Sequence, residues 1–258
     1  MHEILLILRS SPDWTTFDLE SSRHFLRSIG RPETLIIEFA ALWSRHFKVD
    51  YRGVRAQLKT LALQTYNDVR HASLLRHEEW DGKAEPGGWV AFVDDDDWMC
   101  PALFESLPAT TSDAEGARWG SLRLGRAFAA NGYAGPIIQR RPLDRIVYTN
   151  NYAVTSGALR RLGREAFFEH GVAQRAFDQS GFALATCDNY LSCAVKHPCS
   201  TMSAEYLMSL DSFRSDPRRE MSNFMKAVDA MRLDDTVEWL REPFARFREV
   251  MTDAVRPR

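Results

Sequence analysis

The chain has 258 residues, of which 45% are hydrophobic, so it is long enough to bury a sizeable core and is not expected to be disordered. Its 33 Lys and Arg residues nearly balance its 35 Asp and Glu residues, which gives a formal net charge of −2. This balance excludes the strongly basic surface typical of proteins that bind nucleic acid, and any anionic ligand must be held by a local site.

The first residues predict a strand. Residues 4–8 (ILLIL) form a short apolar run that lacks the basic lead-in and the small-residue cleavage site of a signal peptide. No stretch approaches the roughly 20 apolar residues needed to span a bilayer, so we expect a cytoplasmic protein without a transmembrane segment. Peripheral docking on a membrane face stays open. The four cysteines are expected to remain reduced.

Strand-like and helix-like segments alternate along the chain, which predicts an α/β fold with a parallel or mixed sheet. The clearest strand is 89–93 (WVAFV), which follows a Pro-Gly-Gly turn. In chain order, the expected elements are strand 4–8, helix 16–29, strand 34–39, a helix to 47, helix 54–66, strand 72–75, a turn at 85–88, strand 89–93, helix 101–107, strands 121–124 and 145–154, helix 158–170, strand 183–195, and helices from 216 onward with a kink at Pro243.

Four consecutive carboxylates, Asp94-Asp95-Asp96-Asp97, directly follow the strand at 89–93. Like charges this close repel one another unless a positive group lies among them. Mg²⁺ or Mn²⁺ would supply that charge, prefers oxygen ligands and neutralises a diphosphate leaving group. The carboxyl end of a strand is also where open α/β sheets bind ligands. The run therefore predicts a metal and nucleotide site, and a solvated acidic turn or helix cap is the alternative.

The stretch from Phe92 to Glu105 (FVDDDDWMCPALFE) resembles the DXD segment of GT-A glycosyltransferases. The resemblance implies a GT-A sandwich for nucleotide-diphospho-sugar transfer, with a mixed, mostly parallel sheet. It also implies that Asp94 contacts the nucleotide ribose or the metal ion, that Asp96 is the principal metal ligand, and that Asp95 belongs to the nucleotide site. On this basis we expect a GT-A domain at 1–210 and a helical extension at 211–258 packed on it.

Two other stretches resemble the same superfamily more faintly. Residues 58–68 (LKTLALQTYND) are similar to an early helix with a Gln-Thr turn in inverting GT-A enzymes and in bacterial proteins assigned as rhamnosyltransferases. Residues 190–198 (YLSCAVKHP) look like a late strand that often ends in a metal-binding histidine, which implies that His197 is a further metal ligand. A surface His before a turn proline is the alternative.

The resemblance also implies contacts to the base and ribose near the first strands. Arg9 and Ser10 follow the first expected strand, and Glu38 ends the second, although such residues are often ordinary surface residues. An inverting enzyme also needs a carboxylate base. Asp188 is favoured over Asp178 because it lies nine residues before His197.

Two further patterns bear on ligands. The segment 148–152 (YTNNY) is rich in hydrogen-bonding and aromatic groups and suits a sugar-binding strand. A cluster of thiols and one imidazole raises the question of zinc, but the spacing lacks the close pairs of a structural zinc site. Its members are Cys187, Cys193, His197 and Cys199.

The leading interpretation is a metal-dependent glycosyltransferase that moves a sugar from a nucleotide-diphosphate donor to a saccharide or lipid-linked acceptor. A nucleotidyltransferase is the alternative enzyme, disfavoured because no Gly-rich, Lys-containing phosphate loop follows the first strand. A non-catalytic metal- or nucleotide-binding module is the third alternative, and the chain lacks the spacing of an EF-hand.

Overall fold

A computed structural model describes residues 4–9, 33–48, 50–80, 88–109, 113–129, 132–136, 139–140, 150–163, 170–197, 199, 215–230 and 235–255. The chain forms two compact units whose segments alternate along the sequence. The first unit comprises Met1–Ser10, Ala62–Arg123 and Gln139–Val195, and the second comprises Ser11–Leu61, Leu124–Ile138 and Lys196–Arg258. The domain boundary expected at residue 210 stays a prediction.

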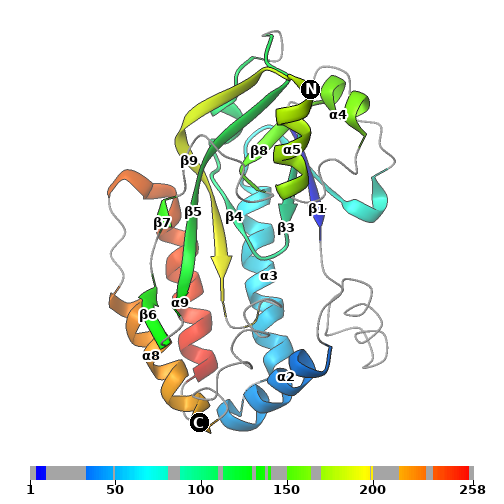
Figure 1. Ribbon diagram of the computed structural model, residues 1–258. Coiled ribbons are helices and arrows are strands. Elements are labelled where there is room, and N and C mark those ends of the chain that lie inside the picture. The colour runs from blue at the N-terminus through cyan, green and yellow to red at the C-terminus, as the bar shows by residue number, and fades with distance from the viewer. Residues whose placement is uncertain are drawn as a thin grey trace. The chain divides into compact units, whose positions relative to one another are not determined.

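The sheet of the first unit is mixed (Figure 1). Its strands follow the order β2-β1-β3-β8-β5-β9-β4, and β7 pairs with β5. Pairs of β1 with β2 and β3 are parallel, whereas the pairs β3–β8, β5–β8, β5–β7 and β4–β9 are antiparallel. The strands are β1 (Ile4–Arg9), β2 (Ala72–Arg76), β3 (Trp89–Asp94), β4 (Trp98–Met99), β5 (Gly116–Ala129), β7 (Gln139–Arg140), β8 (Tyr152–Thr155) and β9 (Leu184–Lys196).

This arrangement confirms a mixed α/β fold. The expected predominance of parallel pairs is wrong for the described strands, because only the pairs of β1 are parallel and the remaining pairs with a described register are antiparallel.

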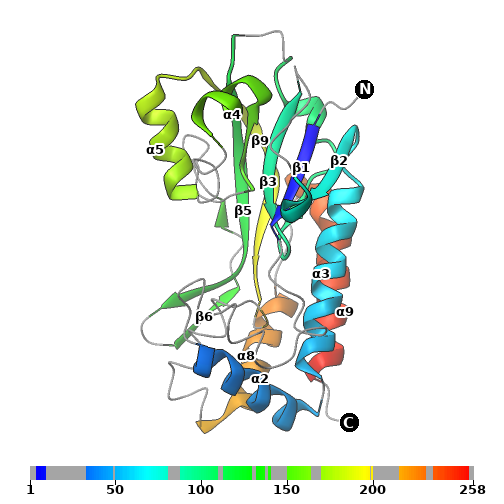
Figure 2. The same ribbon diagram turned by 90° about the vertical axis from the view of Figure 1, so that its right-hand side faces the viewer.

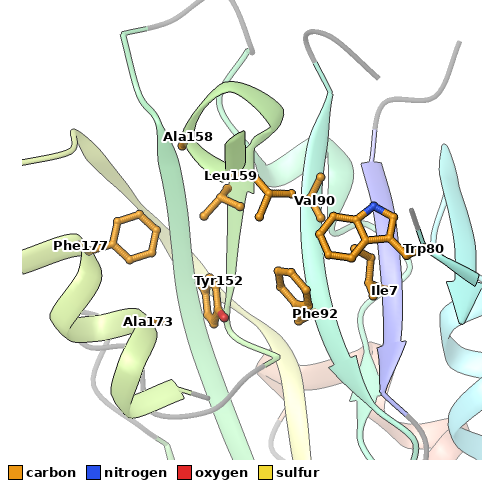
Figure 3. Packing of buried hydrophobic residues seen from close by; sticks show 10 residues of the cluster. Ile7, Trp80, Val90, Phe92, Tyr152, Ala158, Leu159, Ala173 and Phe177 are labelled. Atoms are coloured by element: carbon orange, nitrogen blue, oxygen red, sulfur yellow. The ribbon is translucent and has the colours of Figure 1, made fainter. Parts of the chain in front are cut away.

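The core of the first unit lies between the sheet and two helices, α4 (Ser156–Leu162) and α5 (His170–Ser180). Figure 2 shows both helices on the same side of β3 and β5. Each fully buried apolar side chain contributes about 1.5–3 kcal/mol to folding. Figure 3 shows the cluster, whose buried members are Ile7, Trp80, Val90, Phe92, Tyr152, Val154, Ala158, Leu159, Ala173 and Phe177.

Aromatic rings join the layers of this core edge to face. The ring centroids of Trp80 and Phe92 are 5.9 Å apart, and those of Tyr152 and Phe177 are 6.2 Å apart. Gly116 on β5 allows α5 to approach the sheet closely, because a Cβ at this position would lie 2.7 Å from the Phe177 ring. The apolar runs of β1 and β3 are also buried, as expected for central strands.

The second unit is built mainly from helices. It contains α2 (Glu33–Phe47), the start of α3 (Tyr51–Asn67), α8 (Pro217–Ala230) and α9 (Arg241–Val255). Strand β6 (Gly132–Pro136) pairs antiparallel with the end of β5. Helix α8 contacts α2, α9 and β6. Three 3₁₀ segments complete the described elements of both units: His77–Glu79, Phe104–Ser106 and Asp235–Leu240.

Most of the expected elements are confirmed where the structure describes them. These are the strands at 4–8, 72–75, 89–93, 121–124 and 183–195, the helix at 54–66, and the helices from 216 onward. The helix at 16–29 and residues 145–149 of an expected strand lie outside the described residues. No helix among the described residues is long and apolar enough to cross a bilayer.

Four local expectations are wrong. The helix expected at 158–170 ends at Leu162, because Gly163 caps it with a φ of 78°. Residues 34–39 are the first part of helix α2 and not a strand. The helix expected at 101–107 is only a turn and the 3₁₀ segment at 104–106, and Pro108 restricts Leu107 to an extended conformation. Pro243 lies in the first turn of α9, where proline is tolerated, so it does not kink the helix.

Candidate active site

The acidic run lies at the carboxyl end of β3. Asp94 is the last residue of that strand, Asp95 and Asp96 form a turn, and Asp97 precedes β4. The four side chains differ in burial: Asp95 and Asp97 are only 8% and 1% exposed, whereas Asp94 and Asp96 are partly exposed. The two accessible carboxylates therefore have the spacing of a D-x-D motif.

Asp97 is a buried structural carboxylate. Its Oδ2 accepts a 2.8 Å hydrogen bond from Nδ2 of Asn150, and its Oδ1 accepts a 2.9 Å bond from the backbone N–H of Val195. Hydrogen bonds to a charged group are worth about 1.5–3 kcal/mol each. Asp97 therefore connects the acidic turn to β9 and to the chain just before β8.

Asp94 forms an ion pair with Arg9. Nη2 of Arg9 donates to Oδ1 of Asp94, and the two side chains are 23% and 36% exposed. The pair follows from the sheet register, because Arg9 and Asp94 are neighbours at the ends of the parallel strands β1 and β3. One positive group among the acids is thus supplied by the chain itself. A contact of Arg9 with a nucleotide base stays a prediction.

The end of α3 holds the acidic turn from both sides. The hydroxyl of Tyr66 donates to the backbone carbonyl of Asp94, and Oγ1 of Thr65 accepts a 3.2 Å hydrogen bond from the N–H of Met99. Burial, followed by the charges of the four aspartates, raises the pKa of Tyr66 well above its usual value. Tyr66 is therefore a neutral donor.

Strand β9 pairs with the short strand that follows the acidic run. Its residues Cys193 and Ser192 pair with Trp98 and Met99 of β4, and the carbonyl of Leu191 accepts a 2.8 Å hydrogen bond from the N–H of Cys100. Residues of three separate stretches, 58–68, 92–105 and 190–198, therefore contact one another around the acidic run.

The segment expected to bind sugar has a structural role where it is described. Asn150, Asn151 and Tyr152 are 0% exposed, so their side chains offer no surface to a sugar. The indole N–H of Trp119 donates to the carbonyl of Asn150 and to Oγ of Ser192, both at 3.1 Å. Nδ2 of Asn151 donates to the carbonyl of Trp119 at 3.1 Å. Residues 148 and 149 lie outside the described residues.

Glu38, Ser10 and His197 were also predicted to belong to the site. Glu38 does not end a strand, as had been expected, but lies exposed on helix α2 of the second unit. Ser10 lies outside the described residues. His197 is 2% exposed and belongs to the second unit, so its part in a metal site stays a prediction.

Both candidate bases are exposed. Asp188 lies on β9, seven residues before Val195. At a rise of about 3.3 Å per residue, it is roughly 23 Å along the strand from the contact with Asp97. Asp178 lies on α5, where its Oδ1 accepts a 2.8 Å hydrogen bond from Nε2 of Gln174. Asp188 is therefore not beside the acidic run, and the identity of the base stays a prediction.

The acidic run offers few protein ligands for a metal ion. Among the residues that the structure describes, no three His, Cys, Asp or Glu side chains are grouped so that they could hold a metal ion. Mg²⁺ in nucleotide enzymes, however, is held by one or two carboxylates together with water and substrate phosphates, and not by an all-protein cage. Two accessible carboxylates at a D-x-D spacing, Asp94 and Asp96, fit that mode.

Comparisons with known proteins give no family. No protein-family model matches the chain, and no curated protein matches it. Among solved structures, the chain is similar to an inositol-1-phosphate CTP transferase from T. maritima, with a TM-score of 0.29 and 14% sequence identity, over 81% of this chain and 95% of that chain. A similarity this low supports no conclusion about the fold or the function of the chain. The function is therefore inferred from the acidic run itself.

Proposed function

We propose that the chain is a metal-dependent glycosyltransferase that transfers a sugar from a nucleotide-diphosphate donor to a saccharide or lipid-linked acceptor. One observation carries the proposal: at the carboxyl end of β3, Asp94 and Asp96 are accessible while Asp95 and Asp97 are buried. A charged D-x-D pair at this edge of an α/β sheet suits a nucleotide diphosphate bound through a divalent cation.

Each residue at this edge of the sheet would have a separate role in binding the donor. Asp94 and Asp96 would hold Mn²⁺ or Mg²⁺, which when bound neutralises the charge of the departing diphosphate. Arg9 supplies a further positive charge at the same edge of the sheet. Tyr66 and Thr65 fix the turn that presents the two carboxylates. A preorganised charged site of this kind needs little rearrangement when charge develops on the leaving group.

A thermal-shift panel tests the proposal. The protein is heated with nucleotide-diphosphate sugars, nucleoside triphosphates or no ligand, each with and without Mn²⁺. A ligand at a hundred times its Kd stabilises the folded state by about 2.7 kcal/mol, which a melting curve resolves. We expect a Mn²⁺-dependent rise with a diphosphate sugar, and release of free nucleoside diphosphate when an acceptor is added.

The other outcomes identify the alternatives. A rise with nucleoside triphosphates alone would indicate a nucleotidyltransferase. A rise with the metal ion but with no nucleotide would indicate a binding module. Asp96→Asn is the matched variant, because it removes one charge at a partly exposed position and should abolish the metal-dependent rise while leaving the melting temperature of the free protein unchanged.

A further inference from the structure

The ion pair between Arg9 and Asp94 occupies one of the two carboxylates assigned to the metal ion. It joins the last residues of two neighbouring parallel strands, β1 and β3. Both side chains keep contact with solvent, at 23% and 36% exposure. Because partly exposed ion pairs typically contribute only about 0–1 kcal/mol, the pair can open when a stronger partner binds.

We infer that Arg9 is the counter-ion that holds Asp94 in the donor-free protein, and that its guanidinium transfers to the donor's diphosphate when a divalent cation binds Asp94. This inference rests on the proposed function. No covalent bond changes in the exchange: an arginine–carboxylate contact is replaced by a cation–carboxylate contact and an arginine–phosphate contact.

The surroundings of the pair favour this exchange. The guanidinium group has a planar fork of donors that matches phosphate as well as carboxylate, so Arg9 has a suitable second partner in a diphosphate. Both side chains of the pair are partly exposed, so a diphosphate can reach the guanidinium of Arg9 from solvent.

The exchange has a measurable consequence for metal affinity. Without a donor, a divalent cation must approach Asp94 against the positive charge of Arg9. Removal of that charge should therefore tighten metal binding to the donor-free protein, while weakening the binding of a diphosphate. A merely structural role for Arg9 would not move these two affinities in opposite directions.

Isothermal titration of the full-length, donor-free protein with MnCl₂ tests the inference. Arg9→Gln is expected to bind Mn²⁺ about tenfold more tightly than the wild type, and to bind UDP or GDP at saturating Mn²⁺ about tenfold more weakly. Arg9→Lys keeps the charge but loses the fork, so it should retain the wild-type affinity for Mn²⁺ and bind the diphosphate more weakly.

Arg161→Gln is the matched control. Arg161 also pairs with a carboxylate of the first unit, that of Glu115. Glu115 lies near Trp89, the first residue of β3, so the pair is roughly 17 Å along the strand from Asp94. The variant makes the same change in charge and should leave both affinities at the wild-type value.

The outcomes separate the inference from the proposed function. If the wild type binds Mn²⁺ and a nucleoside diphosphate, and Arg9→Gln binds Mn²⁺ no more tightly, the inference is overturned while the proposed function stands. If correctly folded wild-type protein binds neither Mn²⁺ nor any nucleoside diphosphate, the proposed function fails and the inference fails with it. Circular dichroism of each variant establishes that it is folded.

Discussion

At the scale of single residues, four adjacent aspartates have two different tasks. Asp94 and Asp96 face solvent at the end of β3, whereas Asp95 and Asp97 point inward. A turn with alternate residues on opposite sides separates the carboxylates that can bind a ligand from those that hold the turn. Mutation of residues in the same run should therefore give opposite patterns of effects on activity and stability.

Loss of the accessible carboxylates should affect ligand binding and not folding. Asp96→Ala is expected to lower sugar transfer by on the order of 10² or more, the scale for loss of one preorganised charge-stabilising group, and Asp94→Ala should have a smaller effect. Turnover and Mn²⁺-dependent nucleotide binding are the measurements. Full activity in a folded Asp96→Ala protein would refute the metal-site assignment.

Loss of the Asp97 charge should lower the stability of the fold. In Asp97→Asn, an amide replaces one of the two oxygens that accept hydrogen bonds from Asn150 and Val195, which places two donors face to face. We expect the free energy of unfolding in urea to fall by about 2–4 kcal/mol. Asp113→Asn, at an exposed position, should change it by less than about 0.5 kcal/mol. Equal stabilities of the two variants would contradict the structural role of Asp97.

At the scale of elements, the sequence predicted what depends on local pattern. The apolar runs of β1 and β3 and the helical spacing of α3, α8 and α9 were sufficient to locate these elements. The prediction of a strand at 34–39 was wrong because a short apolar run does not distinguish a strand from a buried helix. Only its continuation to Phe47, with Trp43 and Phe47 buried four residues apart, shows that the segment is a helix.

The apolar face of α9 provides a test at this scale. Phe247 is 2% exposed, and its ring stacks against that of Phe244 with centroids 6.5 Å apart. Phe247→Ala is expected to lower the free energy of unfolding by about 3–5 kcal/mol, because it leaves a cavity in a packed core. The neighbouring Arg246 is exposed and forms an i,i+4 pair with Glu242, so Arg246→Ala should cost about 0.5 kcal/mol or less. A small loss in Phe247→Ala would show that α9 is loosely attached.

At the scale of the whole molecule, the candidate site could be predicted only in part. The acidic run and its place after a strand are local features, and both were found from the sequence. The residues that hydrogen-bond to the run and to Met99 beside it come from four distant parts of the chain. They are Arg9, Thr65, Tyr66, Asn150 and Val195. Which residues such contacts join depends on sheet register and on the path of β9, and no local pattern specifies either. For the same reason, the polar segment at 148–152 was interpreted as a sugar contact, although its described residue Asn150 is buried against Trp119.

Buried phenols in both units make the whole molecule sensitive to alkali. Burial is the largest cause that raises the pKa of Tyr51 in the second unit and of Tyr66 and Tyr152 in the first. In the unfolded chain these groups ionise near pH 10. Their contribution to stability is therefore fully present below pH 10, and it decreases as the pH rises above 10 toward the folded values, because only the unfolded state loses its protons there.

The expected result is a steep loss of stability above pH 10. Between pH 9 and pH 11, each such phenol should lower the free energy of unfolding by about 1.4 kcal/mol, so three should lower it by about 4 kcal/mol. Urea denaturation at pH 8, 9, 10 and 11 measures the decline. Tyr152→Phe removes one phenol from the core of the first unit and should reduce the decline by about 1.4 kcal/mol, whatever its stability at pH 8. An unchanged decline in Tyr152→Phe would show that this hydroxyl ionises as readily in the folded protein as in the unfolded chain.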